Sequence, residues 1–213
     1  MARYGNQKTP YYEDMLPEPD DPYGIAKVAG ENTLKLLADQ HEMNYNIAVP
    51  HNIVGPNQKY DDPFRNVASI MVNRMLQNKQ PIIYGDGSQK RAFSCIDDCL
   101  LPLWNAAVAP AASKQIINLG GIEEYSINQA CEILRSVLPN SGNVIHKESR
   151  HEVKNSIPTF QKSIDLLDFE HKTDLKEGLS KMWEWVKTQP VRERFVWPFY
   201  ELDKGIYSFW KTK

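Results

Sequence analysis

The stretch from Asp21 to Lys27 reads Asp-Pro-Tyr-Gly-Ile-Ala-Lys. Pro22 fixes φ at a value that suits the first turn of a helix, so we expect a helix to begin here. Tyr23 and Lys27 are then four residues apart and share one helix face. A free phenol has a pKa near ~10, and a cation held beside it favours the phenolate. The pair therefore predicts a base for a substrate hydroxyl, with a surface helix that carries no chemistry as the alternative.

The periodicity of apolar residues outside this stretch predicts alternating helices and short strands. We expect helices at residues 22–40, 65–78, 97–109, 126–138 and 175–186. We expect strands at residues 45–49, 81–84, 91–95 and 115–119. Ser126 and Gln129 have the spacing of a capping box, and a Gly-Asp-Gly turn at 85–87 separates two of the strands. The pattern indicates an α/β protein.

The composition argues against several classes of function. With 25 basic and 27 acidic side chains, the 213 residues have no positive field that would attract nucleic acid. The three cysteines have no zinc-ligand spacing, so we expect reduced thiols, no metal site and a cytoplasmic protein. No run approaches ~18 apolar residues, and no signal peptide follows Met1, so we expect no membrane partner.

Several further motifs surround the tyrosine–lysine pair. They are Tyr4-Gly5, Asn52-Ile53-Val54-Gly55-Pro56, the run from Tyr84 to Arg91, and Asn118-Leu119-Gly120-Gly121. In this order and spacing they resemble the NAD-dependent nucleotide-sugar epimerase/dehydratase family, which belongs to the extended short-chain dehydrogenase/reductase superfamily. The resemblance extends to about Val186. It implies an incomplete Rossmann-type parallel sheet interleaved with a smaller α+β substrate-binding domain.

The resemblance also implies how the domains divide the chain. Residues 1–56 and 96–120 would form a remnant of the dinucleotide-binding domain, and 57–95 and 121–213 the substrate-binding domain. The chain would start at the end of the strand that leads into Tyr4-Gly5. The Gly-x-x-Gly-x-x-Gly turn that receives the cofactor pyrophosphate in this family is absent from the 213 residues. We therefore expect a truncated or incomplete epimerase, or one completed by a separate polypeptide, whose NAD binding needs the missing half.

The resemblance assigns the reacting end of the site to three residues. Tyr23 would be the base on the C4 hydroxyl of the sugar. Lys27 would favour the phenolate and hydrogen-bond the nicotinamide ribose of NAD. His51 occupies a position near the nicotinamide that is often aromatic in the family, with a packed or capping histidine as the alternative.

Seven further residues would bind the nucleotide part of the substrate, again by resemblance. They are Asn52, Asn66, Ile83, Tyr84, Arg91, Arg150 and Glu152. Arg91 would grip the diphosphate with its rigid donor fork. Asn66 could equally be a helix N-cap. Arg150 and Glu152 resemble an Arg-x-x-Asp/Glu pair on the diphosphate and ribose, with a spacing one residue shorter.

One departure from the family separates its chemistries. The dehydratases and decarboxylases of the superfamily carry an acidic residue two places before Tyr-Gly, where this chain has Ala2. The resemblance therefore implies a UDP-glucose 4-epimerase-like protein. Two alternatives stay open: a non-catalytic remnant that binds sugar nucleotide or dimerises with an intact homologue, and a related enzyme acting at another carbon. The family pairs through the helix that carries the tyrosine and lysine, so a homodimer is also expected.

Overall fold

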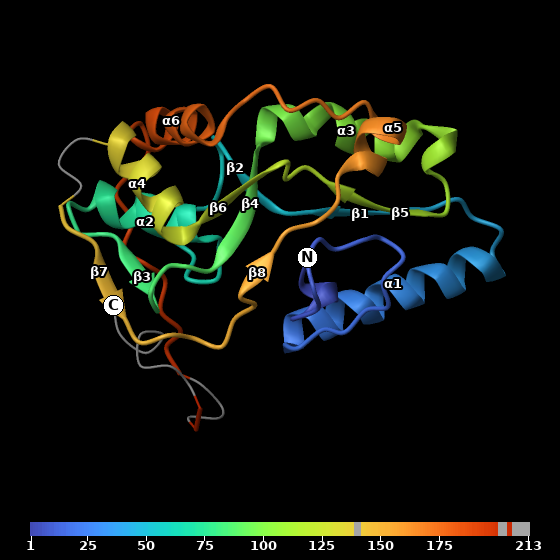
Figure 1. Cartoon of the computed structure of the whole chain (residues 1–213), viewed down its shortest axis with the longest axis horizontal. Helices are drawn as coiled ribbons and strands as arrows, with labels where there is room; N and C mark the ends of the chain where they lie inside the picture. The colour runs from blue at the N-terminus through green and yellow to red at the C-terminus, as the bar shows by residue number, and fades with distance from the viewer. Residues whose placement is uncertain (139–141, 200–203, 206–213) are drawn as a thin grey trace.

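A computed structural model describes residues 1–138, 142–199 and 204–205 of this α/β protein (Figure 1). The remaining residues fall in the predicted substrate-binding domain and lie outside the described residues. The helices are α1 (Pro22–Gln40), α2 (Val67–Leu76), α3 (Ile96–Val108), α4 (Ile127–Val137), α5 (Gln161–Leu167) and α6 (Leu175–Val186), with short 3-10 turns η1 (Ala2–Tyr4) and η2 (Pro110–Ala112). The strands are β1 (Asn46–Pro50), β2 (Asn52–Val54), β3 (Ile82–Tyr84), β4 (Lys90–Cys95), β5 (Gln115–Leu119), β6 (Glu123–Ser126), β7 (Ile145–Lys147) and β8 (Asn155–Ser156).

Strands β1 and β5 pair in parallel, from Asn46 opposite Gln115 to Pro50 opposite Leu119. Helices α3 and α5 lie on one side of this pair and α1 on the other (Figure 1). Ile117 and Leu119 of β5 are buried in the cluster that includes α3 and α5. Val49 is buried on the opposite face, in the cluster formed by Tyr4 and Tyr11. Both faces of the β1–β5 pair are therefore covered, as is usual for parallel sheets, which are buried on both sides.

A second sheet is centred on β4, which pairs in parallel with β2 and β8 and antiparallel with β6. Helices α2, α4 and α6 cover it and supply most of the largest core cluster. Strand β3 pairs with β7 instead. The two strands predicted on either side of the Gly-Asp-Gly turn are therefore present, but they do not pair with each other.

The predicted helix start at Pro22 is confirmed. Asp21 is the N-cap, and its Oδ1 accepts a hydrogen bond from the Gly24 N–H at 2.6 Å. The capping box of Ser126 and Gln129 is confirmed as well, since each residue bonds the backbone of the other. These local signals depend only on neighbouring residues, which is why the sequence carries them.

The predicted strand end before Tyr4-Gly5 is wrong, because residues 2–4 form the 3-10 turn η1. Arg3 is buried in this turn and pairs with Glu31 of α1, with 2.8 Å between Nε and Oε1. A buried guanidinium needs such an anionic partner, because an unpaired charge away from water is costly.

Strand β1 has one paired edge among the described residues, the edge that β5 occupies. Helix α1 nearby exposes the apolar side chains of Ile25, Leu36 and Leu37. An open strand edge and exposed apolar side chains are both features that proteins usually cover.

Candidate functional site

Tyr23 and Lys27 of α1 meet as the sequence predicts. The Lys27 Nζ atom lies over the Tyr23 ring, 5.2 Å from the ring centroid. Both side chains line a cavity of about 220 Å³ whose other walls are η1 and the segment Ile47–Pro50 of β1. Because Tyr23 is 63% exposed, its hydroxyl is accessible to a ligand. A phenol and an ammonium at a cavity wall can together hold and move a proton.

Glu31 follows Lys27 by one further turn and lines the same cavity. Its two carboxylate oxygens accept hydrogen bonds from the Arg3 Nε atom at 2.8 and 3.1 Å. Neither residue was predicted as part of the site. Glu31 has the right spacing, four residues after Lys27 on the same face, but its partner Arg3 is 28 residues away in the chain.

A second cavity, of about 180 Å³, collects all seven residues that were predicted to bind the nucleotide. They come from β2, the N-cap of α2, β3, β4 and the segment before β8. Val67, Ile70 and Ile127 add apolar wall. Both cavities are smaller than the ~300–1,000 Å³ of a typical ligand site, so each has room for one part of a sugar nucleotide or dinucleotide.

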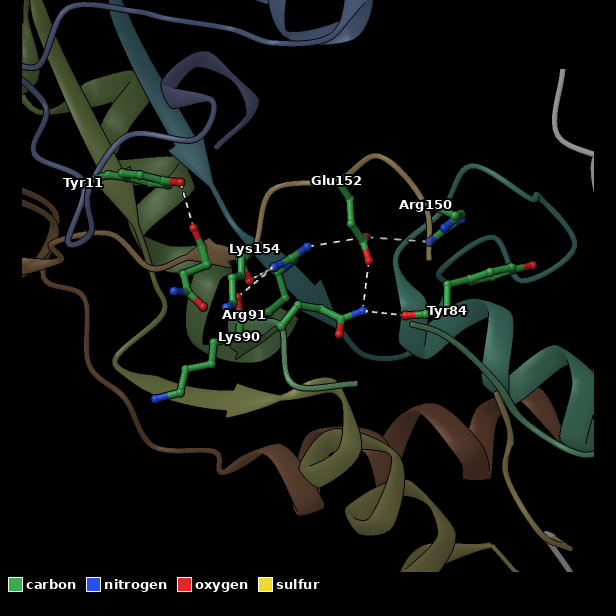
Figure 2. Close-up of polar contacts among 9 residues, drawn as sticks. Tyr11, Tyr84, Lys90, Arg91, Arg150, Glu152 and Lys154 are labelled. Carbon is green, nitrogen blue, oxygen red and sulfur yellow. Dashed lines mark hydrogen bonds and ion pairs between the residues drawn. The ribbon is translucent and has the colours of Figure 1, made fainter. Parts of the chain in front are cut away.

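Arg91 lies inside the second cavity with its side chain 13% exposed. Its Nη1 atom donates to the Lys90 and Lys154 carbonyls at 2.8 and 3.1 Å (Figure 2). Its Nη2 atom lies 3.4 Å from Glu152 Oε2. Burial lowers the pKa of Arg91 from its ordinary value, and Glu152 opposes that change. These contacts fix the guanidinium in one orientation, with a carboxylate in front of it.

Tyr84 and Arg150 stack at the far end of the same cavity. The guanidinium carbon of Arg150 lies 4.1 Å from the centroid of the Tyr84 ring. Gln89, which sequence reasoning missed, donates from Nε2 to the Tyr84 carbonyl at 3.0 Å and to Glu152 at 2.9 Å (Figure 2). Burial raises the pKa of Tyr84, and Arg150 opposes that rise. Together they add an aromatic ring and a positive charge to the cavity wall.

The two asparagines of the cavity also have structural partners. Asn66 is the N-cap of α2, because its Oδ1 accepts from the Ser69 N–H at 3.0 Å, and its Nδ2 donates to the Ile53 carbonyl. Asn52 Nδ2 donates to the Ala92 carbonyl at 3.2 Å. The capping role offered as the alternative for Asn66 is therefore present, and it holds the side chain at the cavity wall.

In the sequence, His51 stands between Pro50, which lines the first cavity, and Asn52, which lines the second. Its own side chain lines neither cavity. The residue is 8% exposed, and neither ring nitrogen has a hydrogen-bond partner in the described structure. Burial lowers the pKa of His51 to about 3, so the imidazole is neutral. Gly121, with φ of +81°, passes so close that a Cβ there would overlap the ring. The packed alternative therefore describes its environment.

The residues present fit one end of an NAD molecule. The phenol and ammonium of Tyr23 and Lys27 suit a nicotinamide ribose, which offers hydroxyl groups. The 213 residues contain no Gly-x-x-Gly-x-x-Gly turn for the pyrophosphate. Within residues 1–138, 142–199 and 204–205, no three His, Cys, Asp or Glu side chains are grouped to hold a metal ion. In the same residues, no helix is both long enough and apolar enough to cross a membrane.

Comparison with known proteins gives a consistent result. The family model described as "NAD dependent epimerase/dehydratase family" matches residues 2–120. A protein of Methanocaldococcus jannaschii, provisionally named a UDP-glucose 4-epimerase, is 31% identical over 87% of this chain and 60% of its own length. The Mycolicibacterium smegmatis UDP-glucose 4-epimerase is 27% identical over 84% of this chain and 57% of its own.

Solved structures agree with these relatives. The Thermotoga maritima UDP-glucose 4-epimerase with UDP-glucose superposes with a TM-score of 0.78 and 28% identity, covering 86% of this chain and 60% of that one. The Bacillus cereus UDP-glucuronic acid 4-epimerase, in complex with UDP-glucuronic acid and NAD, has a TM-score of 0.78 and 27% identity, covering 87% and 59%. The chain thus spans about 60% of the length of the proteins it matches.

Proposed function

The chain belongs to the NAD dependent epimerase/dehydratase family, and on that premise we propose that it serves the 4-epimerisation of a nucleotide sugar. The observation that carries the proposal is the second cavity, where the seven residues that the family resemblance assigns to the nucleotide meet. The neighbouring cavity supplies the acid–base pair of Tyr23 and Lys27. The epimerases that the chain resembles in sequence and structure support the same assignment.

Tyr23 has the central chemical role in this proposal. Its oxygen removes the proton from the C4 hydroxyl of the sugar and later returns a proton to the same oxygen. Lys27 stabilises the negative charge that Tyr23 carries before it takes up this proton and after it has returned it. NAD, when bound, would supply the hydride acceptor for oxidation at C4 and the hydride donor for the return. Lys27 and Tyr23 are the residues of this chain that would hold its nicotinamide ribose.

The second cavity orients the substrate by its nucleotide. Arg91 and Arg150 neutralise the diphosphate, a task for which the guanidinium fork is suited. Asn52 adds an amide at the diphosphate, and the strand residues Ile83 and Tyr84 present their backbone to the base. Holding the nucleotide this firmly leaves the sugar as the part that can turn between the two hydride transfers.

The choice of reaction rests on Ala2, which lines the first cavity. Dehydration and decarboxylation of a nucleotide sugar need a second group that moves a proton, and an alanine has none. A single Tyr/Lys pair suffices for oxidation and reduction at one carbon. The alternative is a related enzyme that oxidises and reduces another carbon of the sugar by the same chemistry.

The second candidate function is non-catalytic: the chain would bind a sugar nucleotide without converting it, or would pair with an intact homologue. The observation in its favour is that the nucleotide cavity is assembled from residues other than those that line the Tyr23–Lys27 cavity. The exposed apolar residues Ile25, Leu36 and Leu37 of α1 give such pairing a surface, either with a second copy or with the homologue.

Isothermal titration calorimetry with UDP-glucose and with NAD tests the proposal. We expect UDP-glucose to bind, and NAD to bind weakly or not at all to the chain by itself. Tight NAD binding would exclude the non-catalytic candidate. No affinity for either ligand would exclude the epimerase. An assay of UDP-glucose to UDP-galactose conversion at saturating NAD then separates binding from catalysis.

A further inference from the structure

Helix α3 turns an apolar face to solvent on the outer side of the β1–β5 pair (Figure 1). Within residues 98–112, which end with the turn η2, every exposed residue is apolar: Leu100, Leu101, Leu103, Trp104, Ala107, Val108, Pro110 and Ala111. The sequence has no charged residue from Cys99 to Ser113. Helix α6 gives the contrast, because its exposed residues are all charged: Lys176, Glu177 and Glu184.

The opposite face of α3 is already covered. Cys99 and Ala106 are buried there, in the cluster that also contains Ile117 and Leu119 of β5. A helix with apolar residues on both faces is normally covered on both. The outer face of α3 therefore has the composition of a contact surface.

The size of this face matches one half of a dimer contact. Its five large side chains are between 37% and 64% exposed: Leu100, Leu101, Leu103, Trp104 and Val108. At ~200 Å² for a fully exposed side chain of this size, they present about 500 Å² of apolar surface. A standard protein interface takes ~800 Å² from each partner, of which ~450–500 Å² is apolar. The face is therefore large enough for a stable contact.

We propose that the outer face of α3 is a dimer contact and that its partner is the same face of a second copy of this chain. Leu100, Trp104 and Val108 follow at intervals of four residues and form one stripe along the helix. The stripe is symmetric about Trp104. Two antiparallel copies that cross there place Leu100 of one opposite Val108 of the other. The two tryptophans then meet at the centre, where interfaces have their strongest contacts, and no like charges oppose the pairing.

This contact is separate from the one expected at α1, because α1 lies on the other side of the β1–β5 pair (Figure 1). It also does not depend on the proposed function, which concerns the two cavities. A chain that uses both faces forms assemblies larger than a dimer. A substitution at one face then leaves the contact at the other face intact.

The double variant Leu100→Cys with Val108→Cys tests the pairing. The three native cysteines are buried, so the two new thiols are the accessible ones. We expect mild oxidation to link the double variant into covalent dimers on a non-reducing gel. Each single variant is a control, because its two identical cysteines lie ~12 Å apart along the paired helices, too far for a disulfide. No covalent dimer of the double variant, or equal cross-linking of the single variants, would overturn the inference.

Analytical ultracentrifugation measures the strength of the contact. It uses the Leu36→Arg chain, in which the contact expected at α1 is weakened, and we expect a reversible dimer. Adding Trp104→Lys should raise the dissociation constant at least tenfold, since a charge would be buried at an apolar contact. Adding Trp197→Lys is the matched control, because Trp197 is 50% exposed outside α3, and the constant should stay within twofold. A monomeric Leu36→Arg chain, or equal effects of the two tryptophan substitutions, would leave the face of α3 to a different partner and overturn the inference.

Discussion

The Arg3 side chain and the Glu31 side chain form a buried ion pair, with 3% and 9% of their surfaces exposed. The contact joins the first turn of the chain to the middle of α1, beside the Tyr23–Lys27 cavity. Removing one partner leaves the other charge buried without compensation, which costs far more than the loss of a surface pair.

Glu31→Ala should therefore lower the free energy of unfolding by ~3–5 kcal/mol, measured by urea denaturation. Glu132→Ala is the control, because Glu132 pairs with Arg135 on the exposed side of α4 and should change the value by under ~0.5 kcal/mol. The double variant Arg3→Met with Glu31→Leu should regain most of the loss. Equal effects of the two single variants would show that the buried pair contributes no more than a surface pair.

Tyr23→Phe should reduce 4-epimerase activity by ~10²–10⁴-fold, because the variant keeps the ring and loses the proton-carrying oxygen. The assay measures conversion of UDP-glucose to UDP-galactose at saturating NAD. It is run with the chain alone and, separately, with an added intact homologue that binds NAD. Calorimetric affinity for UDP should not change. Tyr12→Phe, at another exposed tyrosine, is the control. Full activity in Tyr23→Phe would remove this residue from the mechanism.

Arg91→Lys should weaken UDP-glucose binding by ~10-fold or more, because an ammonium cannot reproduce the oriented fork that the Lys90 and Lys154 carbonyls hold. Calorimetry measures the change. The control is Lys90→Met at the adjacent position, whose side chain points to Glu124 instead of the cavity. An effect of the same size in both variants would indicate a general loss of positive charge.

The buried His51 side chain should make the free energy of unfolding fall at acid pH. Burial lowers its pKa to about 3, against an ordinary value of 6.5, so the unfolded chain takes up a proton at a higher pH than the folded one. The contribution of neutral His51 is complete above pH 6.5 and is lost as the pH falls toward 3, by up to ~1.4 kcal/mol for each pH unit. His51→Phe should flatten the urea-denaturation profile over that range. The same change at exposed His41 should not alter it.

The exposed apolar residues of α1 predict self-association. Leu36→Arg should raise the dissociation constant of a dimer by at least tenfold in analytical ultracentrifugation, since burying a charge at an apolar contact is costly. The control is Leu16→Arg, which changes a leucine that is 79% exposed in the loop before α1. A monomeric wild type at all concentrations would contradict the expectation.

Sequence reasoning was most accurate where the signal is local. The helix at residues 22–40 and the strand at 115–119 have the predicted bounds, because Pro22 and the apolar residues Ile116, Ile117 and Leu119 act on their own neighbours. Strands β6 and β8 were missed because they are short and polar, and only pairing with β4 makes them strands. Charge partners such as Arg3 with Glu31 were missed for the same reason, since the contact depends on the folded chain.

The same limit, that contacts between distant residues are missed, applies to the candidate site. The family resemblance led to the seven residues of the nucleotide cavity and left a helix N-cap as the alternative for Asn66. It could not show that Gln89 bridges Tyr84 and Glu152. It also could not tell which way His51 points. These properties depend on neighbours in space that no local pattern specifies.

Residues 46–54 run from β1 into β2 with no turn, so one continuous length of backbone belongs to two sheets. Its first half borders the Tyr23 cavity, and Asn52 borders the Arg91 cavity. A tilt of one sheet against the other would strain this shared span. In the proposed 4-epimerisation, a substrate lying across this span would therefore meet a rigid surface, and the sugar itself would turn about its phosphate linkage.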